Sequence, residues 1–287
     1  MLNLRLSVNC HLQTQTSVYF CRMKLIPVCF FVWLILMSCN DTVKKSREEP
    51  VQNAGREQLL KDSVATFPDS LQLKEKLIEY YRSQDDISKA LATTEAAINK
   101  DSLNYRLWEM KATLHYENDD TANAISSYET ALQLNPLPRY IILLGSLYAQ
   151  TQNKKALDMA DFLLQSKIPN TEKEANFIKG LYYNYTGEKN KAITFFDKCL
   201  NLDYTYMLAY REKGIALYDL GKYNDAISVL DKAVTLQNSF DEGYYWLGRC
   251  LEKLNKPADA IEEYKTALLY APDFIEARSA LEKLGVK

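Results

Sequence analysis

The carboxyl-terminal part of the chain repeats one arrangement of large apolar, small apolar and polar positions. The arrangement is clearest over residues 241–274, which read DEGYYWLGRCLEKLNKPADAIEEYKTALLYAPDF. With Asp241 as position 1, the characteristic residues are Tyr244 at 4, Leu247 at 7, Gly248 at 8, Ala260 at 20, Tyr264 at 24, Ala267 at 27 and Pro272 at 32. Because small residues let helices approach and large residues fill the remaining volume, the pattern predicts two packed helices per unit.

Five further copies of this unit precede residue 241. Their predicted ranges are 71–104, 105–137, 138–172, 173–206 and 207–240. Gly187 and Gly221, each at position 15 of its unit, are expected to supply the positive φ that ends a first helix. Pro257 suits the first turn of a second helix. A lone capping helix is predicted from Arg56 to Thr66, and a closing helix over 275–285.

The unit resembles the tetratricopeptide repeat, which spaces an aromatic residue, Leu, Gly, an aromatic, Ala, an aromatic, Ala and Pro over about 34 residues. Unit 241–274 departs from this pattern at position 11, where Leu251 stands in place of the usual Tyr. The resemblance implies an all-α fold, a right-handed α-solenoid of about six tetratricopeptide repeats with capping helices. It also implies a concave groove that receives an extended or helical peptide, lined by first-helix positions near 2, 5, 9, 12 and 13.

The groove positions differ between the two ends of the array, being mixed and acidic early and aromatic with two arginines later. The predicted groove residues are Arg106, Tyr116, Phe177, Asn184, Tyr185, Arg211, Tyr218, Tyr245, Trp246 and Arg249. Aromatic residues and arginine dominate binding energy at interfaces, so the predicted ligand is a peptide with apolar and acidic groups. An alternative for Phe177, as for Leu181 and Ile215, is packing between first helices. The alternative for the two later arginines and Tyr245 is surface decoration without a ligand.

The amino-terminal residues 1–38 carry a different pattern, that of a signal peptide. Lys24 precedes an unbroken apolar run over 25–37, which is too short for the roughly 20 residues of a membrane-spanning helix. The alternative is a buried apolar helix or an uncleaved anchor. Residues 1–22 make little sense ahead of a signal peptide, so translation is predicted to begin at Met23.

The end of the apolar run, Leu36-Met37-Ser38-Cys39, resembles a bacterial lipobox. The resemblance implies that Cys39 is lipidated and becomes the mature amino terminus. The polar residues 39–55 then predict a flexible tether that holds the folded part at a membrane surface. Because Asn40 rather than Asp follows Cys39, the resemblance implies the outer membrane, with the protein facing the periplasm.

Composition limits the chemistry. A formal net charge of −2 provides no basic field for nucleic acid, and residues 1–38 contribute three of the Lys and Arg residues and no acid. His115 is the one histidine after the signal peptide, so Ser/His, Cys/His and His-metal sites lack their parts. Cys199 and Cys250 are predicted to be small core residues. We therefore expect no catalysis, cofactor, metal or small-molecule substrate.

The sequence predicts a non-enzymatic scaffold for protein–protein interaction, lipid-anchored in the bacterial cell envelope. The chaperone-tail type of repeat grips a terminal carboxylate with Lys and Asn at positions 5 and 9 of its first repeat. Glu75 and Glu79 stand at these positions here, so that activity is not predicted. The alternative function is an accessory or regulatory subunit of an envelope enzyme such as a peptidoglycan hydrolase.

Overall fold

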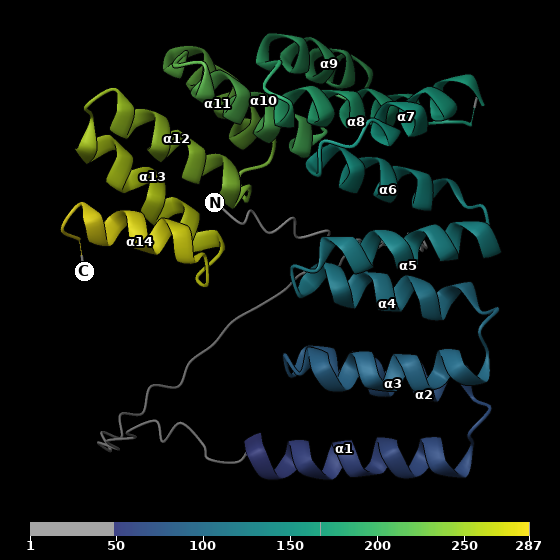
Figure 1. The fold of residues 1–287 in the computed structure, drawn as a ribbon. Helices are drawn as coiled ribbons and strands as arrows, with labels where there is room; N and C mark the ends of the chain where they lie inside the picture. Colours follow the sequence, from purple (N-terminus) through teal and green to yellow (C-terminus); the bar gives the residue numbers. More distant parts are fainter. Residues whose placement is uncertain (1–48, 167, 287) are drawn as a thin grey trace, which may run out of the picture. The chain divides into compact units, whose positions relative to one another are not determined.

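The computed structural model describes residues 49–166 and 168–286, with side chains from Gly55 onward. The predicted signal peptide, Cys39 and the first part of the predicted tether lie outside the described residues. Within them the chain forms fourteen α-helices and no β-strand (Figure 1). The helices are α1 (Glu49–Thr66), α2 (Leu71–Ser83), α3 (Ile87–Lys100), α4 (Tyr105–Glu117), α5 (Thr121–Leu134), α6 (Pro138–Gln150), α7 (Lys155–Gln165), α8 (Glu172–Tyr185), α9 (Lys189–Leu202), α10 (Met207–Asp219), α11 (Tyr223–Leu236), α12 (Asp241–Lys253), α13 (Pro257–Tyr270) and α14 (Ile275–Lys283).

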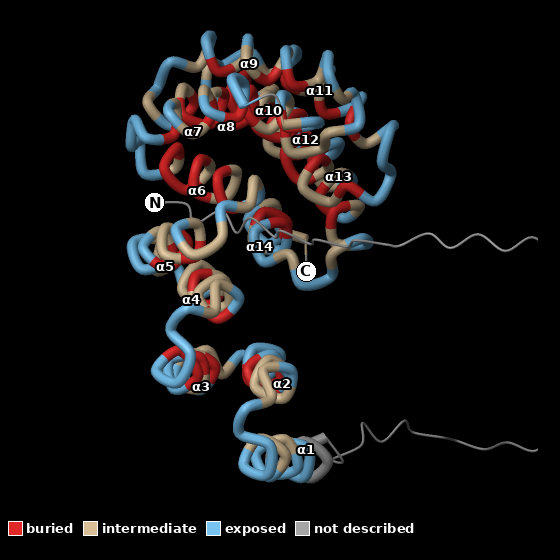
Figure 2. The backbone as a smooth tube through the Cα atoms, turned by 90° about the vertical axis from the view of Figure 1, so that its right-hand side faces the viewer, coloured by how far each residue is buried: buried red, intermediate tan, exposed pale blue. Residues whose placement is uncertain are grey.

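The helices from α2 to α13 form six consecutive packed pairs, one in each predicted repeat range. The second helix of each pair also packs on the first helix of the next, so that each pair contacts its neighbours in the chain. Figure 2 shows the buried residues where successive helices meet. The predicted all-α solenoid is therefore confirmed, with α1 before the pairs and α14 after them.

The first helix is longer than the sequence predicted. It begins at Glu49 instead of Arg56, so the last residues of the predicted flexible tether 39–55 are helical. The helix packs on α2, where its Leu60 and Val64 contact a cluster of buried residues. Tyr81 of α2 donates a hydrogen bond of 3.1 Å to Glu57 Oε1. The helix α1 acts as a cap because the apolar side chains of α2 in this cluster would otherwise be exposed to solvent.

Small residues at position 8 hold the two helices of a repeat in close contact. A Cβ atom added to Gly180 would lie 2.4 Å from the Phe196 ring, and one added to Gly248 would lie 2.6 Å from the Tyr264 ring. Gly214 stands in the same relation to Leu230, at 2.8 Å. In each case the large residue occupies position 24 of the same repeat. In these three repeats a side chain at position 8 would therefore force the large residue at position 24 to move.

The first helix of every repeat is followed by a residue with positive φ at position 15. Gly187 (φ 87°) and Gly221 (φ 72°) confirm the prediction made for them. The other four repeats use residues with side chains, which the sequence did not single out: Asp85, Asp119, Gln152 and Asn255, with φ between 57° and 58°. Asp and Asn adopt the left-handed region more readily than most residues, so the same turn recurs without glycine.

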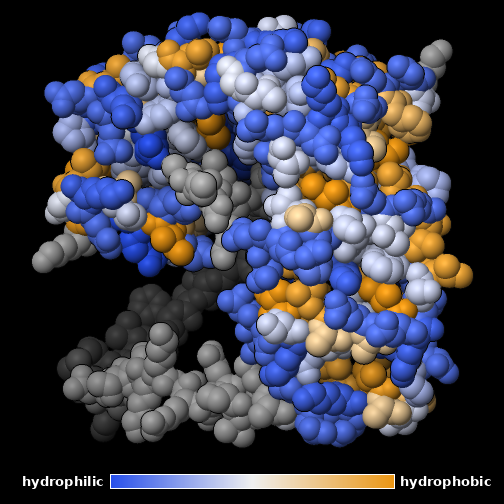
Figure 3. Space-filling view, in the orientation of Figure 1, coloured by the Kyte–Doolittle hydropathy of each residue, from blue (hydrophilic) through white to orange (hydrophobic). Residues whose placement is uncertain are grey.

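The core consists of alternating small and large buried residues, and it includes both described cysteines. Cys199 and Cys250 are free and fully buried, as predicted for small core residues. Burial raises the pKa of each thiol to about 12, so both stay protonated at neutral pH. The face seen in Figure 3 is mostly hydrophilic, and its hydrophobic residues form separate patches.

Candidate functional site

Three ion pairs join first helices of successive repeats in the same register. We call their six residues the inter-repeat ladder: Glu75 with Arg106 at 3.0 Å, Glu109 with Arg139 at 2.7 Å, and Arg211 with Glu242 at 2.7 Å. In each pair, position 5 of one repeat contacts position 2 of the next. The resemblance to the tetratricopeptide repeat implied that both positions line the ligand groove. The ladder therefore uses charges on this face to connect neighbouring repeats of the chain itself.

The last pair of the ladder is buried. Arg211 is only 3% exposed, and its Nη1 donates to both oxygens of Glu242 at 2.8 and 2.7 Å. Its Nε donates to Glu212 Oε1 at 3.1 Å, and Glu212 Oε2 accepts from Asn184 Nδ2 at 3.3 Å. Burial raises the pKa of Glu242 and the neighbouring Arg211 opposes that shift. The prediction that Arg211 and Asn184 are available to a ligand is therefore corrected, because both are buried and paired within the protein.

Several predicted groove aromatics are also packing residues. Phe177 is 5% exposed and contacts the rings of Tyr206 and Phe196, with centroid distances of 5.2 and 5.9 Å. Leu181 and Ile215 are buried as well, so the alternative of packing between first helices describes all three residues. The rings of Tyr245 and Trp246 are equally buried. Their position on a first helix was predicted correctly, but their exposure was not.

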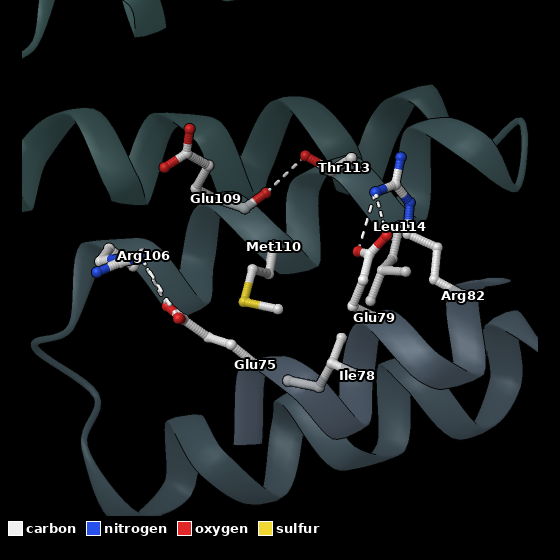
Figure 4. A pocket seen from close by; sticks show the side chains of 9 residues that line it. All are labelled: Glu75, Ile78, Glu79, Arg82, Arg106, Glu109, Met110, Thr113 and Leu114. Atoms are coloured by element: carbon white, nitrogen blue, oxygen red, sulfur yellow. Dashed lines mark hydrogen bonds and ion pairs between the residues drawn. The ribbon is translucent and has the colours of Figure 1, made fainter. Parts of the chain in front are cut away.

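The amino-terminal end of the first-helix face contains a pocket of about 340 Å³ between α2 and α4 (Figure 4). Its residues are Glu75, Ile78, Glu79, Arg82, Arg106, Glu109, Met110, Thr113 and Leu114. Apolar side chains contribute part of the lining, and the charged groups pair with one another or with neighbours. Arg82 contacts Glu79 at 3.1 Å and also binds Glu117, and Arg106 binds Glu75. The predicted mixed and acidic end therefore forms a pocket whose two arginines are already neutralised.

The carboxyl-terminal end of this face has a different arrangement, which we call the Arg249 cluster: Arg249, Tyr218, Tyr245 and Trp246. Arg249 of α12 donates from Nη1 to Tyr245 Oη at 2.8 Å and from Nη2 to Tyr218 Oη of α10 at 3.2 Å. Its guanidinium carbon lies 5.4 to 5.7 Å from the centroids of all three rings. Burial alone would lower the pKa of Arg249, but the two phenols outweigh it and the pKa is raised. The group is thus a permanent cation among aromatic rings.

Three tyrosines of the predicted groove keep exposed surface, namely Tyr116, Tyr185 and Tyr218. Tyr185 of α8 is 38% exposed, and burial of the rest of its side chain, together with the Glu212 carboxylate, raises its pKa to about 12. Tyr116 of α4 is partly exposed. With Arg106 and Arg249, these three are the predicted groove residues that remain accessible to a ligand.

The ladder partners Glu242 and Arg139 were missed, although a signal for them is present in the sequence. Oppositely charged residues recur 30 or 31 residues apart, from position 5 of one repeat to position 2 of the next. The complementary charges are not apparent at any single position of a repeat. They become apparent when position 5 of one repeat is compared with position 2 of the next, because each repeat packs on the next in a constant register.

Within the described ranges, no group of three or more His, Cys, Asp and Glu residues is placed to hold a metal ion. None of the described helices has both the length and the apolar character needed to cross a bilayer. The first-helix face presents groups for hydrogen bonding, ion pairing and aromatic contact.

Sequence-family comparison agrees with this arrangement. Profiles described as tetratricopeptide repeat match residues 76–137, 173–206 and 217–284, which together exceed half of the chain. The chain belongs to the tetratricopeptide repeat family. No curated protein matches it at a significant level.

Solved structures of tetratricopeptide repeat proteins share the fold. A tetratricopeptide repeat protein from Parabacteroides merdae ATCC 43184 is 19% identical with a TM-score of 0.69, covering 83% of this chain and 94% of that one. PilW, a type IV pilus biogenesis factor, is 19% identical with a TM-score of 0.55, covering 74% of this chain and 100% of that one. The APC/C hetero-tetramer Cut9-Hcn1 is 20% identical with a TM-score of 0.53, covering 82% of this chain and 47% of that one. At these identities the likeness concerns the fold alone.

Proposed function

We propose that this tetratricopeptide repeat protein is a lipid-anchored scaffold of the bacterial cell envelope that binds a peptide segment along its first-helix face. The family supports a role in protein–protein interaction. The observation that carries the peptide-binding part is the Arg249 cluster, because it places a cation and aromatic rings, one of them the partly exposed Tyr218, on two adjacent first helices. Arginine and aromatic residues are the types that contribute most to binding energy at interfaces.

The anchor rests on the amino-terminal sequence. A basic residue, an apolar run over 25–37 and Leu36-Met37-Ser38-Cys39 together support removal of residues 1–38 and lipidation of Cys39. Asn40 after the cysteine supports the outer membrane and a periplasmic location. No enzymatic activity, cofactor, nucleic acid or small-molecule substrate is part of the proposal.

Mass spectrometry of the mature protein tests the anchor. We expect an acylated Cys39 at the amino terminus, and we expect the Cys39→Ser variant to leave the membrane fraction. A protein that retains a free Met1 or Met23 would contradict both the cleavage and the lipidation.

Binding to an array of random seven-residue peptides tests the groove. We expect the Tyr185→Ala variant to bind the selected peptides about tenfold more weakly, because an interface aromatic at this site contributes more than about 1 kcal/mol. The matched control is Phe162→Ala, which removes an aromatic ring of 53% exposure from α7, a second helix. Equal losses in the two variants, or no change in Tyr185→Ala, would place the ligand on another face.

A further inference from the structure

Arg249 is the exception among the arginines of the six first helices. Arg82, Arg106, Arg139 and Arg211 each lie within 3.1 Å of a carboxylate oxygen. In the described part of the chain, Arg249 forms no ion pair with a carboxylate, and its side chain donates hydrogen bonds to the phenols of Tyr245 and Tyr218. The protein thus neutralises four of these cations internally and leaves the fifth one charged.

The setting of Arg249 favours an external anion. The side chain is partly exposed, unlike Arg211, and two of its five N–H groups donate to the phenols. The phenol contacts and the three surrounding rings hold the guanidinium in place between α10 and α12. A fixed planar guanidinium with remaining donors matches the two oxygens of a carboxylate. Because the side chain is already held, binding costs little further side-chain entropy.

We propose that Arg249 binds a carboxylate of the peptide partner, with an apolar residue of the same peptide resting on the exposed part of the Tyr218 ring. This inference rests on the proposed function, since it names the chemistry recognised at one point of that surface. The sequence predicted that two arginines of the groove contact acidic groups of the peptide. Arg211 is paired with Glu212 and Glu242 inside the protein, so the inference assigns this contact to Arg249 alone. The carboxylate belongs either to an Asp or Glu side chain or to the peptide's carboxyl terminus.

Matched synthetic peptides on the array distinguish these two sources. Each apolar seven-residue core is made in three forms. The first has an internal Glu and an amidated carboxyl end, the second has Gln at that position and an amidated end, and the third has Gln and a free carboxyl end. We expect the unmodified protein to bind one of the carboxylate forms about tenfold more tightly than its amide counterpart, which corresponds to about 1.4 kcal/mol. Preference for the Glu form identifies a side chain, and preference for the free end identifies a terminus. Equal affinity for all three forms overturns the inference.

Substitution of Arg249 then tests the residue itself. We expect Arg249→Gln to lose the carboxylate preference while still binding the apolar cores, and Arg249→Lys to retain part of it, because the charge remains without the planar fork. Arg278→Gln, which removes an exposed arginine from the closing helix α14, is expected to keep the full preference. A preference that persists in a folded Arg249→Gln protein, checked by circular dichroism, overturns the assignment. If Arg249→Gln fails to fold, the comparison of matched peptides on the unmodified protein and Arg249→Lys decides the question.

The failure of this inference differs from the failure of the proposed function. If apolar cores bind without regard to charge, the peptide-binding surface stands and the role of Arg249 is refuted. If no peptide binds to the unmodified protein, both the groove and the carboxylate site are refuted.

Discussion

Single residues at the turn inside each repeat show how the same backbone is reached by different side chains. Position 15 has positive φ in all six repeats, and it is Gly in two of them and Asp, Asn or Gln in the others. Side chains with a Cβ are strained in this region by about 1–2 kcal/mol, less so for Asp and Asn. Gln152 (φ 57°) has no such compensation. The backbone N–H of Gln152 still donates a hydrogen bond to the Ala149 carbonyl oxygen at 3.0 Å, so the turn forms despite the strain.

Replacing Gln152 with glycine should therefore stabilise the protein. We expect Gln152→Gly to increase the free energy of unfolding by about 0.5–1 kcal/mol, since the relief of strain exceeds the extra entropy of glycine in the unfolded chain. Urea denaturation measures the change. Asn255→Gly is the control, and a smaller gain is expected there. A decrease for Gln152→Gly would show that its side chain makes a contact worth more than the strain.

At the scale of helices, the inter-repeat ladder connects α2 to α4, α4 to α6 and α10 to α12. Burial decides what each connection contributes. Exposed ion pairs such as Arg106 with Glu75 are worth about 0–1 kcal/mol, because water screens them. A buried pair is close to neutral in net terms, but removing one partner leaves the other charged and desolvated. Ion pairs in the same register are therefore expected to differ widely in how much the loss of one partner lowers the free energy of unfolding.

Removal of one partner from each kind of pair tests this difference. We expect Arg211→Met to lower the free energy of unfolding by about 3–5 kcal/mol, because Glu212 and Glu242 then lose their buried cation. Arg106→Met should lower it by less than about 1 kcal/mol. Chemical denaturation of the two variants measures both values, and the double variant Arg211→Met with Glu242→Gln should recover part of the loss. Equal effects of the two single substitutions would refute the role assigned to burial.

At the scale of the described array, helices contact mainly their neighbours along the chain. The local stability of each repeat is therefore expected to depend on the adjacent repeats and to differ along the array. The closing helix α14 illustrates this. Its Ala277 and Leu281 are buried in the same cluster as residues of α12 and α13. The helix therefore covers an apolar surface that belongs to the last repeat, and its effect should reach little further.

Deleting residues 275–287 should loosen the last repeat alone. We expect faster amide hydrogen exchange in α12 and α13, with exchange in α4 and α5 unchanged, because the exposed apolar surface lies on the last pair. Exchange followed by mass spectrometry resolves the segments. Ile275→Ala, at a residue of 69% exposure, is the control and should change neither segment. An equal acceleration in all helices would show that the array unfolds as one cooperative unit.

The sequence by itself determined the repeat length, the helix pairs and the positions of small and large core residues. It could do so because a fixed spacing of Gly, Ala and aromatic residues permits only one close packing of each helix on its neighbours, as Gly248 against Tyr264 shows. The candidate site was only partly predictable. Whether Arg211 or Arg249 faces a ligand depends on which residues of the adjacent repeat reach it, and Glu242 reaches Arg211 while Tyr218 reaches Arg249. Burial and pairing between repeats are properties of the tertiary structure, so only the structure decided which charge remains for a partner.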